Sequence, residues 1–242
     1  MYSLLFSTAL AFSPYDLSSL EAILERTRPH RALRDLSVYP SIPSSAYKTA
    51  ASGEIATGLD QIPGYSAKLG WGVAVFDTPI EVLFPAINDE MQHTGLTPVN
   101  FTQIVSGKPC VDGRQVMMIL PLTMMSDRWW VTTQSTNDTL RDQTAYRMAE
   151  ISWVGVSEYS TLPLQPAVRE KVKDMVHLPF TQGAWLLIKL DEQHTLAEYH
   201  SWSDPGGYMP AGVASTFAAG SISTTFEAMD QFAKKNVTTC VF

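Results

Sequence analysis

The C-terminal third of the chain most constrains its fold, because a long helix there follows a series of strands. After Pro210, small and apolar residues recur at helical spacing as far as about Lys235, which predicts an amphipathic helix. Strand-like segments precede it at residues 68–76, 99–107, 114–121, 127–135, 146–157, 184–191 and 195–203. The last two flank Glu192 and Gln193, as in a β-hairpin. Antiparallel strands with one long helix across a face indicate an α+β architecture.

Two shorter helical segments lie among these strands. Thr78 and Pro79 are typical of a helix start, the apolar stripe that follows reaches Met91, and Gly95 is typical of the end. Residues 167–176 also have helical spacing between prolines. Residues 136–144 are polar and are predicted to form a loop.

Residues 1–65 are predicted to form a helical extension and residues 66–242 the main domain, since Gly and Pro cluster between them. The longest apolar run, residues 2–12, is too short to span a bilayer. It is either a segment that packs on the domain or a secretory signal, for which Ala9 and Ala11 supply a cleavage pattern. The packed segment is favoured, and with it a cytoplasmic location over a periplasmic or secreted one.

The charges and cysteines exclude some functions and leave others open. The net charge is −7 with only 17 Lys and Arg residues, so nucleic acid is not an expected partner. Five basic residues within residues 26–34 are interpreted as a solvated helix end, in preference to an anion or membrane contact. Cys110 and Cys240 are the two cysteines, and they either pair or are unrelated thiols.

Several short motifs occur in a characteristic order. A Gly-Ala-Trp strand start at residues 183–185 is followed by Tyr199 on the next strand and by an Asp-Pro-Gly-Gly turn at residues 204–207. Upstream, Phe-Asp-Thr-Pro at residues 76–79 leads into a helix, and Asp-Arg-Trp-Trp at residues 127–130 begins a strand. In this order and spacing, the chain resembles the START (StAR-related lipid transfer) superfamily.

The resemblance covers roughly residues 66–236 and implies a helix-grip fold, in which a curved antiparallel sheet wraps around the C-terminal helix and encloses an apolar tunnel. Members of the superfamily bind a sterol, phospholipid, ceramide or other hydrophobic molecule, and most are not enzymes. The resemblance therefore implies a monomeric lipid carrier that needs no cofactor and contacts membranes transiently. It places the tunnel mouth between residues 161–182, which we expect to form a helical lid, and residues 204–210.

Some members of the superfamily place an acid and an arginine on adjacent strands inside the tunnel. The matching positions here, residues 117–120 and 131–134, contain no such pair, so a charged ligand head group held in that way is not expected. The candidate ligand contacts are the apolar, aromatic and small residues of the strands and the last helix, with ordinary core packing as the alternative for each. They are Met117, Ile119, Trp130, Arg147, Trp153, Trp185, Leu187, Tyr199, Trp202, Val213, Phe217 and Ser221.

An enzyme on the same fold, a polyketide cyclase or a hydrolase, is the alternative. Tyr146, Arg147, Tyr199 and His200 are the residues that could serve it, although Arg147 is better explained as a surface residue. The five histidines form neither an HxH nor an HExxH pattern, so no metal site is predicted. A third hypothesis gives the N-terminal 65 residues the role of recruiting a partner.

Overall fold

The structure is a computed structural model. It describes residues 12–35, 39–65, 67–123, 125–158, 160, 162–207, 211–235 and 237–242, and of residues 211–220 it describes the backbone alone. The predictions made for residues 1–11 and for the side chains of Val213 and Phe217 therefore lie outside the described part.

The elements follow the predicted order of helices, strands and a long final helix. They are α1 (Leu17–Thr27), η1 (Arg28–Leu33), α2 (Ser44–Ala51), β1 (Ala56–Gln61), β2 (Lys68–Phe76), α3 (Ile80–Asn88), η2 (Glu90–Gln92), β3 (Phe101–Ser106), β4 (Arg114–Leu120), β5 (Arg128–Thr136), α4 (Asp138–Gln143), β6 (Met148–Gly155), α5 (Pro166–Val172), β7 (Val176–His177), β8 (Phe180–Lys189), β9 (Thr195–Asp204) and α6 (Ala211–Lys235).

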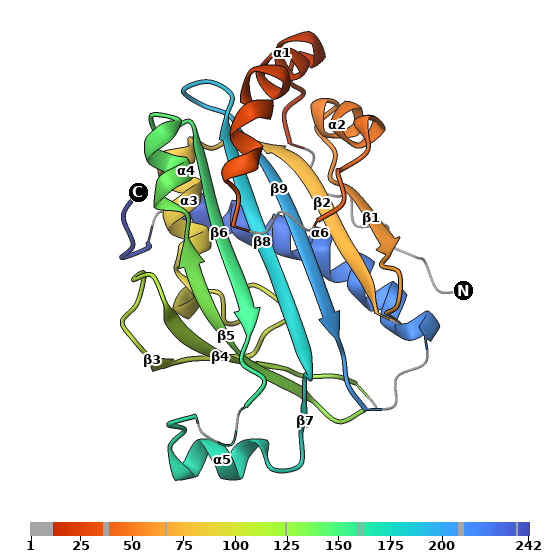
Figure 1. Cartoon of the computed structure of the whole chain (residues 1–242), viewed down its shortest axis with the longest axis vertical. Helices are drawn as coiled ribbons and strands as arrows, with labels where there is room; N and C mark the ends of the chain where they lie inside the picture. Colours follow the sequence, from red (N-terminus) through yellow and green to blue (C-terminus); the bar gives the residue numbers. More distant parts are fainter. Residues whose placement is uncertain are drawn as a thin grey trace, which may run out of the picture.

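The strands form one curved sheet in the order β1-β2-β9-β8-β6-β5-β4-β3, and each neighbouring pair is antiparallel. The short β7 pairs in parallel with β5 at one end. Helix α6 crosses the inner face of the sheet, while α1 and α2 lie on the outer face (Figure 1). The predicted α+β class and helix-grip arrangement are confirmed.

Glycines in β2 explain how closely α6 approaches the sheet. A Cβ atom at Gly72 would lie 2.6 Å from Cγ2 of Ile222 and 2.8 Å from Cε2 of Phe226, and one at Gly70 would lie 2.8 Å from Cδ1 of Ile222. Both α6 side chains are buried. The two glycines therefore leave the space into which the apolar face of α6 packs.

The N-terminal basic stretch is not simply a solvated helix end, and that prediction is wrong for two of its arginines. Nη1 of Arg31 donates to Glu198 on β9 at 2.8 Å, and Nε of Arg34 donates to Glu150 on β6 at 2.6 Å. Both carboxylates are about 1% exposed. Tyr47 of α2 also donates to Glu198, at 2.9 Å. The extension is thus joined to the outer face of the sheet by buried ion pairs.

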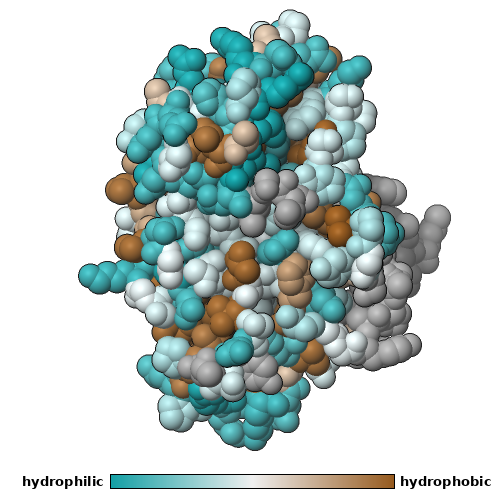
Figure 2. Space-filling view, in the orientation of Figure 1, coloured by the Kyte–Doolittle hydropathy of each residue, from teal (hydrophilic) through white to brown (hydrophobic). Residues whose placement is uncertain are grey.

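The outer face is unevenly covered. Figure 2 shows mainly hydrophilic side chains over the N-terminal helices and apolar ones scattered below them. Val154, on the outer side of β6, is 47% exposed. The N-terminal segment therefore shields one half of this face more than the other.

Three local predictions need correction. Ala56–Gln61, within the predicted helical extension, form β1 and pair with β2, and the polar segment after β5 contains α4. Helix α3 starts after Pro79 and ends at Asn88, well before Gly95. It ends early because Asp89 leaves helical geometry, and its carboxylate accepts hydrogen bonds from the C-terminal tail. The division at residue 65 stays a prediction.

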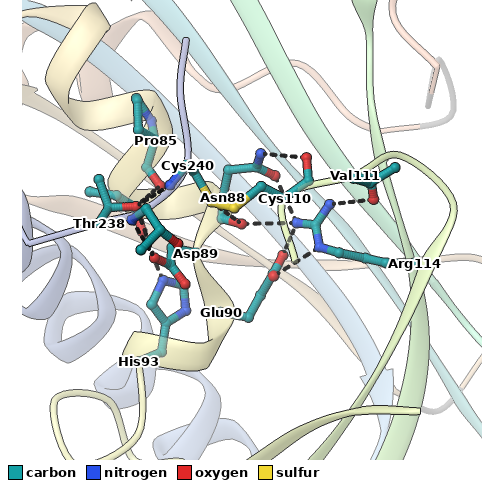
Figure 3. Close-up of a disulfide and its surroundings, with 12 residues drawn as sticks. Pro85, Asn88, Asp89, Glu90, His93, Cys110, Val111, Arg114, Thr238 and Cys240 are labelled. Atoms are coloured by element: carbon teal, nitrogen blue, oxygen red, sulfur yellow. Dashed lines mark hydrogen bonds and ion pairs between the residues drawn. A yellow bond between two sulfur atoms is a disulfide. The ribbon is translucent and has the colours of Figure 1, made fainter. Parts of the chain in front are cut away.

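The two cysteines pair, which settles the alternative left open by the sequence. Cys110, in the turn before β4, is bonded to Cys240 in the tail, with a Cα–Cα distance of 5.4 Å (Figure 3). The hydroxyl of Thr238 donates to Oδ2 of Asp89 at 2.9 Å, and the backbone N–H of Thr239 donates to the same oxygen at 3.2 Å. The tail is therefore fixed against the end of α3 by covalent and polar contacts.

Candidate functional site

A cavity of about 370 Å³ lies between the inner face of the sheet and α6. Its apolar lining includes aromatic side chains from β5, β6, β8 and β9 and aliphatic ones from β4, α3 and α6. The principal apolar members are Ile87, Met118, Leu120, Trp130, Ile151, Trp153, Leu178, Trp185, Tyr199, Ile222 and Met229.

The aromatic rings on the cavity wall contact one another. The ring centroid of Tyr199 lies 4.6 Å from that of Trp185 and 5.6 Å from that of Trp153. Trp185 in turn lies 4.9 Å from Phe226 of α6. These packed rings hold the wall in one shape, and burial raises the pKa of Tyr199, so its hydroxyl is neutral at pH 7. The cavity wall is thus rigid, aromatic and uncharged at this point.

Arg128 holds one end of the cavity together. Its Nε donates to the backbone oxygen of Pro205 at 2.8 Å, and its Nη2 donates to that of Gly206 at 3.2 Å. Nη1 donates to the backbone oxygen of Ser126 in the β4–β5 loop. Gly206 and Gly207 both have positive φ, which favours glycine and turns the chain towards α6. The guanidinium therefore joins two loops beside the start of α6.

The predicted lid, residues 161–182, contributes only partly to the cavity. Leu178 and Thr181 line it, and α5 forms within the segment. Leu162, Leu164 and Val172, in contrast, pack with Met117 and Trp129 in a separate apolar cluster. Most of the segment therefore packs on the outer side of β4 and β5.

The other end of the cavity contains a buried ion pair. Nε of Arg114, the first residue of β4, donates to Oε2 of Glu90 at 3.0 Å, and its Nη2 donates to Oδ1 of Asn88 at 2.7 Å (Figure 3). Glu90 and His93 both line the cavity. Burial lowers the pKa of His93, so its ring is neutral at pH 7. The positions considered in the sequence for an acid and an arginine, residues 117–120 and 131–134, miss this pair, because η2 supplies the acid from outside the strands.

Comparisons with solved structures fit this architecture. A STAR-related lipid transfer protein fragment from Xanthomonas axonopodis superposes with a TM-score of 0.58 at 16% identity, over 74% of this chain and 93% of that one. Human STARD10 gives 0.58 at 14% identity, over 84% of each chain. Human StAR-related lipid transfer protein 5 gives 0.57 at 14% identity, over 90% of this chain and 97% of that one.

The chain has the START fold. The sequence motifs that resemble the superfamily therefore predicted the fold correctly. A scan against protein-family models gives no match, and a search of curated proteins finds no relative. The likeness is thus one of structure, at sequence identities too low to transfer residue roles.

Five of the residues predicted to contact a ligand line the cavity of this START fold. They are Trp130, Trp153, Trp185, Tyr199 and Ser221. Leu187 lies in the core beside α3, away from the cavity lining. Arg147 is exposed and lies just before β6, which agrees with its interpretation as a surface residue.

Met117, Ile119 and Trp202 lie on the opposite side of the sheet from the cavity. Met117 and Ile119 belong to the cluster beneath α5, and Trp202 packs on the outer face. Met118 and Leu120 line the cavity in their place. Residues on both faces of β4 are apolar, because one face meets the cavity and the other meets the segment around α5, so alternation does not reveal which side faces inward.

The residues proposed for a cyclase do not converge. Tyr146 and Arg147 are exposed at the start of β6, and His200 lies on the outer face, where its ring stacks on Tyr39 at 4.8 Å. Tyr199 alone of the four lines the cavity. Among the residues described, no cluster of His, Cys, Asp and Glu could hold a metal ion, and no helix is long and apolar enough to cross a membrane.

The polar lining includes residues that the sequence patterns did not single out. Gln134 and Thr132 of β5 are buried in the cavity wall, and Thr181 and Ser203 share a hydrogen bond of 2.7 Å near its other end. Gln134 lies between Thr133 and Ser135 on β5, so its polar sequence neighbours give no sign that its amide is buried in the cavity wall.

Proposed function

We propose that the protein binds one apolar molecule in the cavity and carries it without changing it chemically. The observation that carries this proposal is the cavity of about 370 Å³, lined by packed aromatic and aliphatic side chains with few charged groups. Pockets of roughly 300–1,000 Å³ with such linings bind organic ligands, chiefly through apolar burial. Two of the solved structures with this fold are named as lipid transfer proteins.

The size favours one compact ligand. The cavity lies near the lower end of that range, and its rigid aromatic wall limits expansion. We therefore expect a ligand with one chain or one ring system, in preference to a phospholipid with two long chains.

Ligand exchange requires one end of the cavity to open. The turn at Pro205 and Gly206 connects β9 to α6, and Arg128 holds it through backbone oxygens. Loss of these few hydrogen bonds would free the turn and the start of α6 without unfolding the sheet. We expect this opening at a membrane surface, with the protein acting as a monomer.

The test is to purify the protein without detergent and to record its native mass spectrum. A lipid-sized adduct in a one-to-one ratio is the expected result, and extraction then identifies the ligand. Ser221→Phe places a ring at the cavity wall and should prevent the adduct from forming. Thr224→Phe adds the same bulk at an exposed position of α6 and is the matched control. A protein that stays empty against sterols, fatty acids and phospholipids would overturn the proposal.

A further inference from the structure

One polar pair on the cavity wall has hydrogen-bonding capacity that the protein does not use. Gln134 is 4% exposed and Thr132 is 1% exposed, and both line the cavity from β5. Nε2 of Gln134 donates to Oγ1 of Thr132 at 2.9 Å. Within the described part of the chain, Oε1 of Gln134 and the hydroxyl hydrogen of Thr132 have no partner. Because both groups open onto a largely apolar cavity, they are available to a ligand that can hydrogen-bond with them.

Two other pairs of polar side chains on the wall are hydrogen-bonded to each other. The hydroxyl groups of Thr181 and Ser203 lie 2.7 Å apart. Tyr199 hydrogen-bonds to Ser201 two residues along β9. The unused acceptor and donor therefore lie together at Gln134 and Thr132.

Two of the three charged side chains that line the cavity, Glu90 and Arg128, are already compensated by the protein. The third, Lys68, begins β2 at the end of the cavity where β9 leads to Pro205, away from Glu90. Both carboxylate oxygens of Glu90 accept hydrogen bonds from Arg114, and the guanidinium of Arg128 is bound by three backbone oxygens. A charged ligand group placed beside Gln134 would lose its hydration without gaining a free opposite charge. The chemistry of the site therefore suits a neutral polar group.

We propose that the ligand of the carrier is a neutral apolar molecule with a hydroxyl group, which donates to Oε1 of Gln134 and accepts from the hydroxyl of Thr132. This inference rests on the proposed carrier function. A hydroxyl group both donates and accepts, so it satisfies the pair in either orientation of the Gln134 amide.

The register of β5 also gives the ligand a direction. Arg128 lies at one end of the cavity, and Gln134 is six residues further along the same strand, which corresponds to about 20 Å. Trp130 lines the wall between them. Trp153, on the neighbouring strand β6, lies opposite Gln134 in the sheet register and also lines the wall. The ligand therefore enters with its hydroxyl group first, and its apolar body lies along the two tryptophans.

The experiment compares pairs of ligands that differ by one hydroxyl group. Cholestanol and cholestane form a rigid pair, and hexadecanol and hexadecane form a flexible one; each is delivered from cyclodextrin and scored by native mass spectrometry. We expect the wild type to bind the alcohol of at least one pair about tenfold more tightly than the hydrocarbon, because buried polar groups select against a ligand that leaves them unpaired.

Gln134→Met and Thr132→Val test the two side chains separately with little change in volume. Each should reduce the preference for the alcohol severalfold, while hydrocarbon binding is retained or increased. Thr181→Val removes a hydroxyl from the other end of the cavity and should keep the preference. Thermal unfolding shows which variants are folded, and if Gln134→Met is not, Thr132→Val still tests the pair.

The outcomes separate this inference from the carrier function. If the wild type binds alcohol and hydrocarbon equally, or takes up only a fatty acid or phospholipid, the hydroxyl assignment is overturned and the carrier function stands. If the wild type binds no apolar molecule, the carrier function itself fails. Unchanged selectivity in both folded variants would also overturn the assignment.

Discussion

Arg31 and Glu198 form an ion pair between positions 167 residues apart, with Nη1 of the arginine 2.8 Å from the carboxylate. Burial alone would raise the pKa of Glu198, but the hydrogen bonds and charge of Arg31 hold it below its ordinary value. The side chain of Glu198 is about 1% exposed, and that of Arg31 is 27% exposed. The carboxylate on β9 therefore depends on the N-terminal segment for its counter-charge.

Arg31→Ala should lower the free energy of unfolding by about 3–5 kcal/mol, because it leaves the buried carboxylate of Glu198 without the arginine of its ion pair, and only the hydrogen bond from Tyr47 remains. Arg28→Ala removes an exposed arginine paired with exposed Glu25 and should change the free energy by less than about 0.5 kcal/mol. Urea unfolding followed by circular dichroism measures both. Equal changes in the free energy of unfolding would show that the ion pair of Arg31 with Glu198 stabilises the fold no more than an exposed ion pair does.

Acid should destabilise the protein through His200. Burial lowers the pKa of this histidine to about 4. The unfolded chain takes up its proton below about pH 6.5, whereas the folded protein does not until about pH 4, so stability falls as the pH drops through this interval. The loss from this residue is of order 3 kcal/mol. His93, also buried with a lowered pKa, contributes in the same direction.

His200→Phe keeps a ring that can stack on Tyr39 and removes the titrating group. Unfolding free energies measured at several pH values between 4 and 6.5 should therefore vary less steeply in the variant than in the wild type. A slope identical to that of the wild type would contradict the assignment of the acid sensitivity to His200.

The disulfide should stabilise the native state by about 2–5 kcal/mol, because it closes a long loop in the unfolded chain. Cys240→Ser, or reduction of the wild type, should lower the unfolding temperature. Disulfides persist mainly in oxidising compartments, so an intact bond in protein isolated from its own cells would favour export over the cytoplasm. Non-reducing peptide mapping measures this. Two free thiols in purified protein held under oxidising conditions would contradict the pairing.

Arg128→Lys should accelerate ligand release severalfold. Lysine keeps the charge, but its single ammonium group does not reproduce the planar fork that joins Pro205, Gly206 and Ser126. Arg147→Lys, at an exposed position away from the cavity, is the control. Stopped-flow transfer of a fluorescent ligand to vesicles gives the rates. Identical rates in both variants would place the exit elsewhere.

The overall architecture was predictable because its signals are local. The hairpin around Glu192 and the long helix after Pro210 follow from turn chemistry and from spacing within one segment. The sequence did not predict which face of β4 points into the cavity. Met117 and Met118 are equally apolar, and only tertiary packing decides which of them faces the cavity.

The ion pairs of the outer face were hidden for a different reason. Glu150 follows Met148 and Ala149 on β6, and Glu198 follows Leu196 and Ala197 on β9. Their partners come from a segment more than 100 residues earlier. A single acid in a buried strand does indicate that a partner exists. It does not say which of the chain's 17 basic residues provides it.

The disulfide also determines how α6 can move. The helix follows β9 in the chain, with residues 205–210 between them, and at its other end the tail is bonded through Cys240 to the turn before β4. A helix with one unattached end could separate from the sheet one turn at a time, but α6 is held at both ends. It can tilt or slide between its anchors, and tension on the C-terminus would pass through the sulfur bridge into the sheet instead of unwinding the helix.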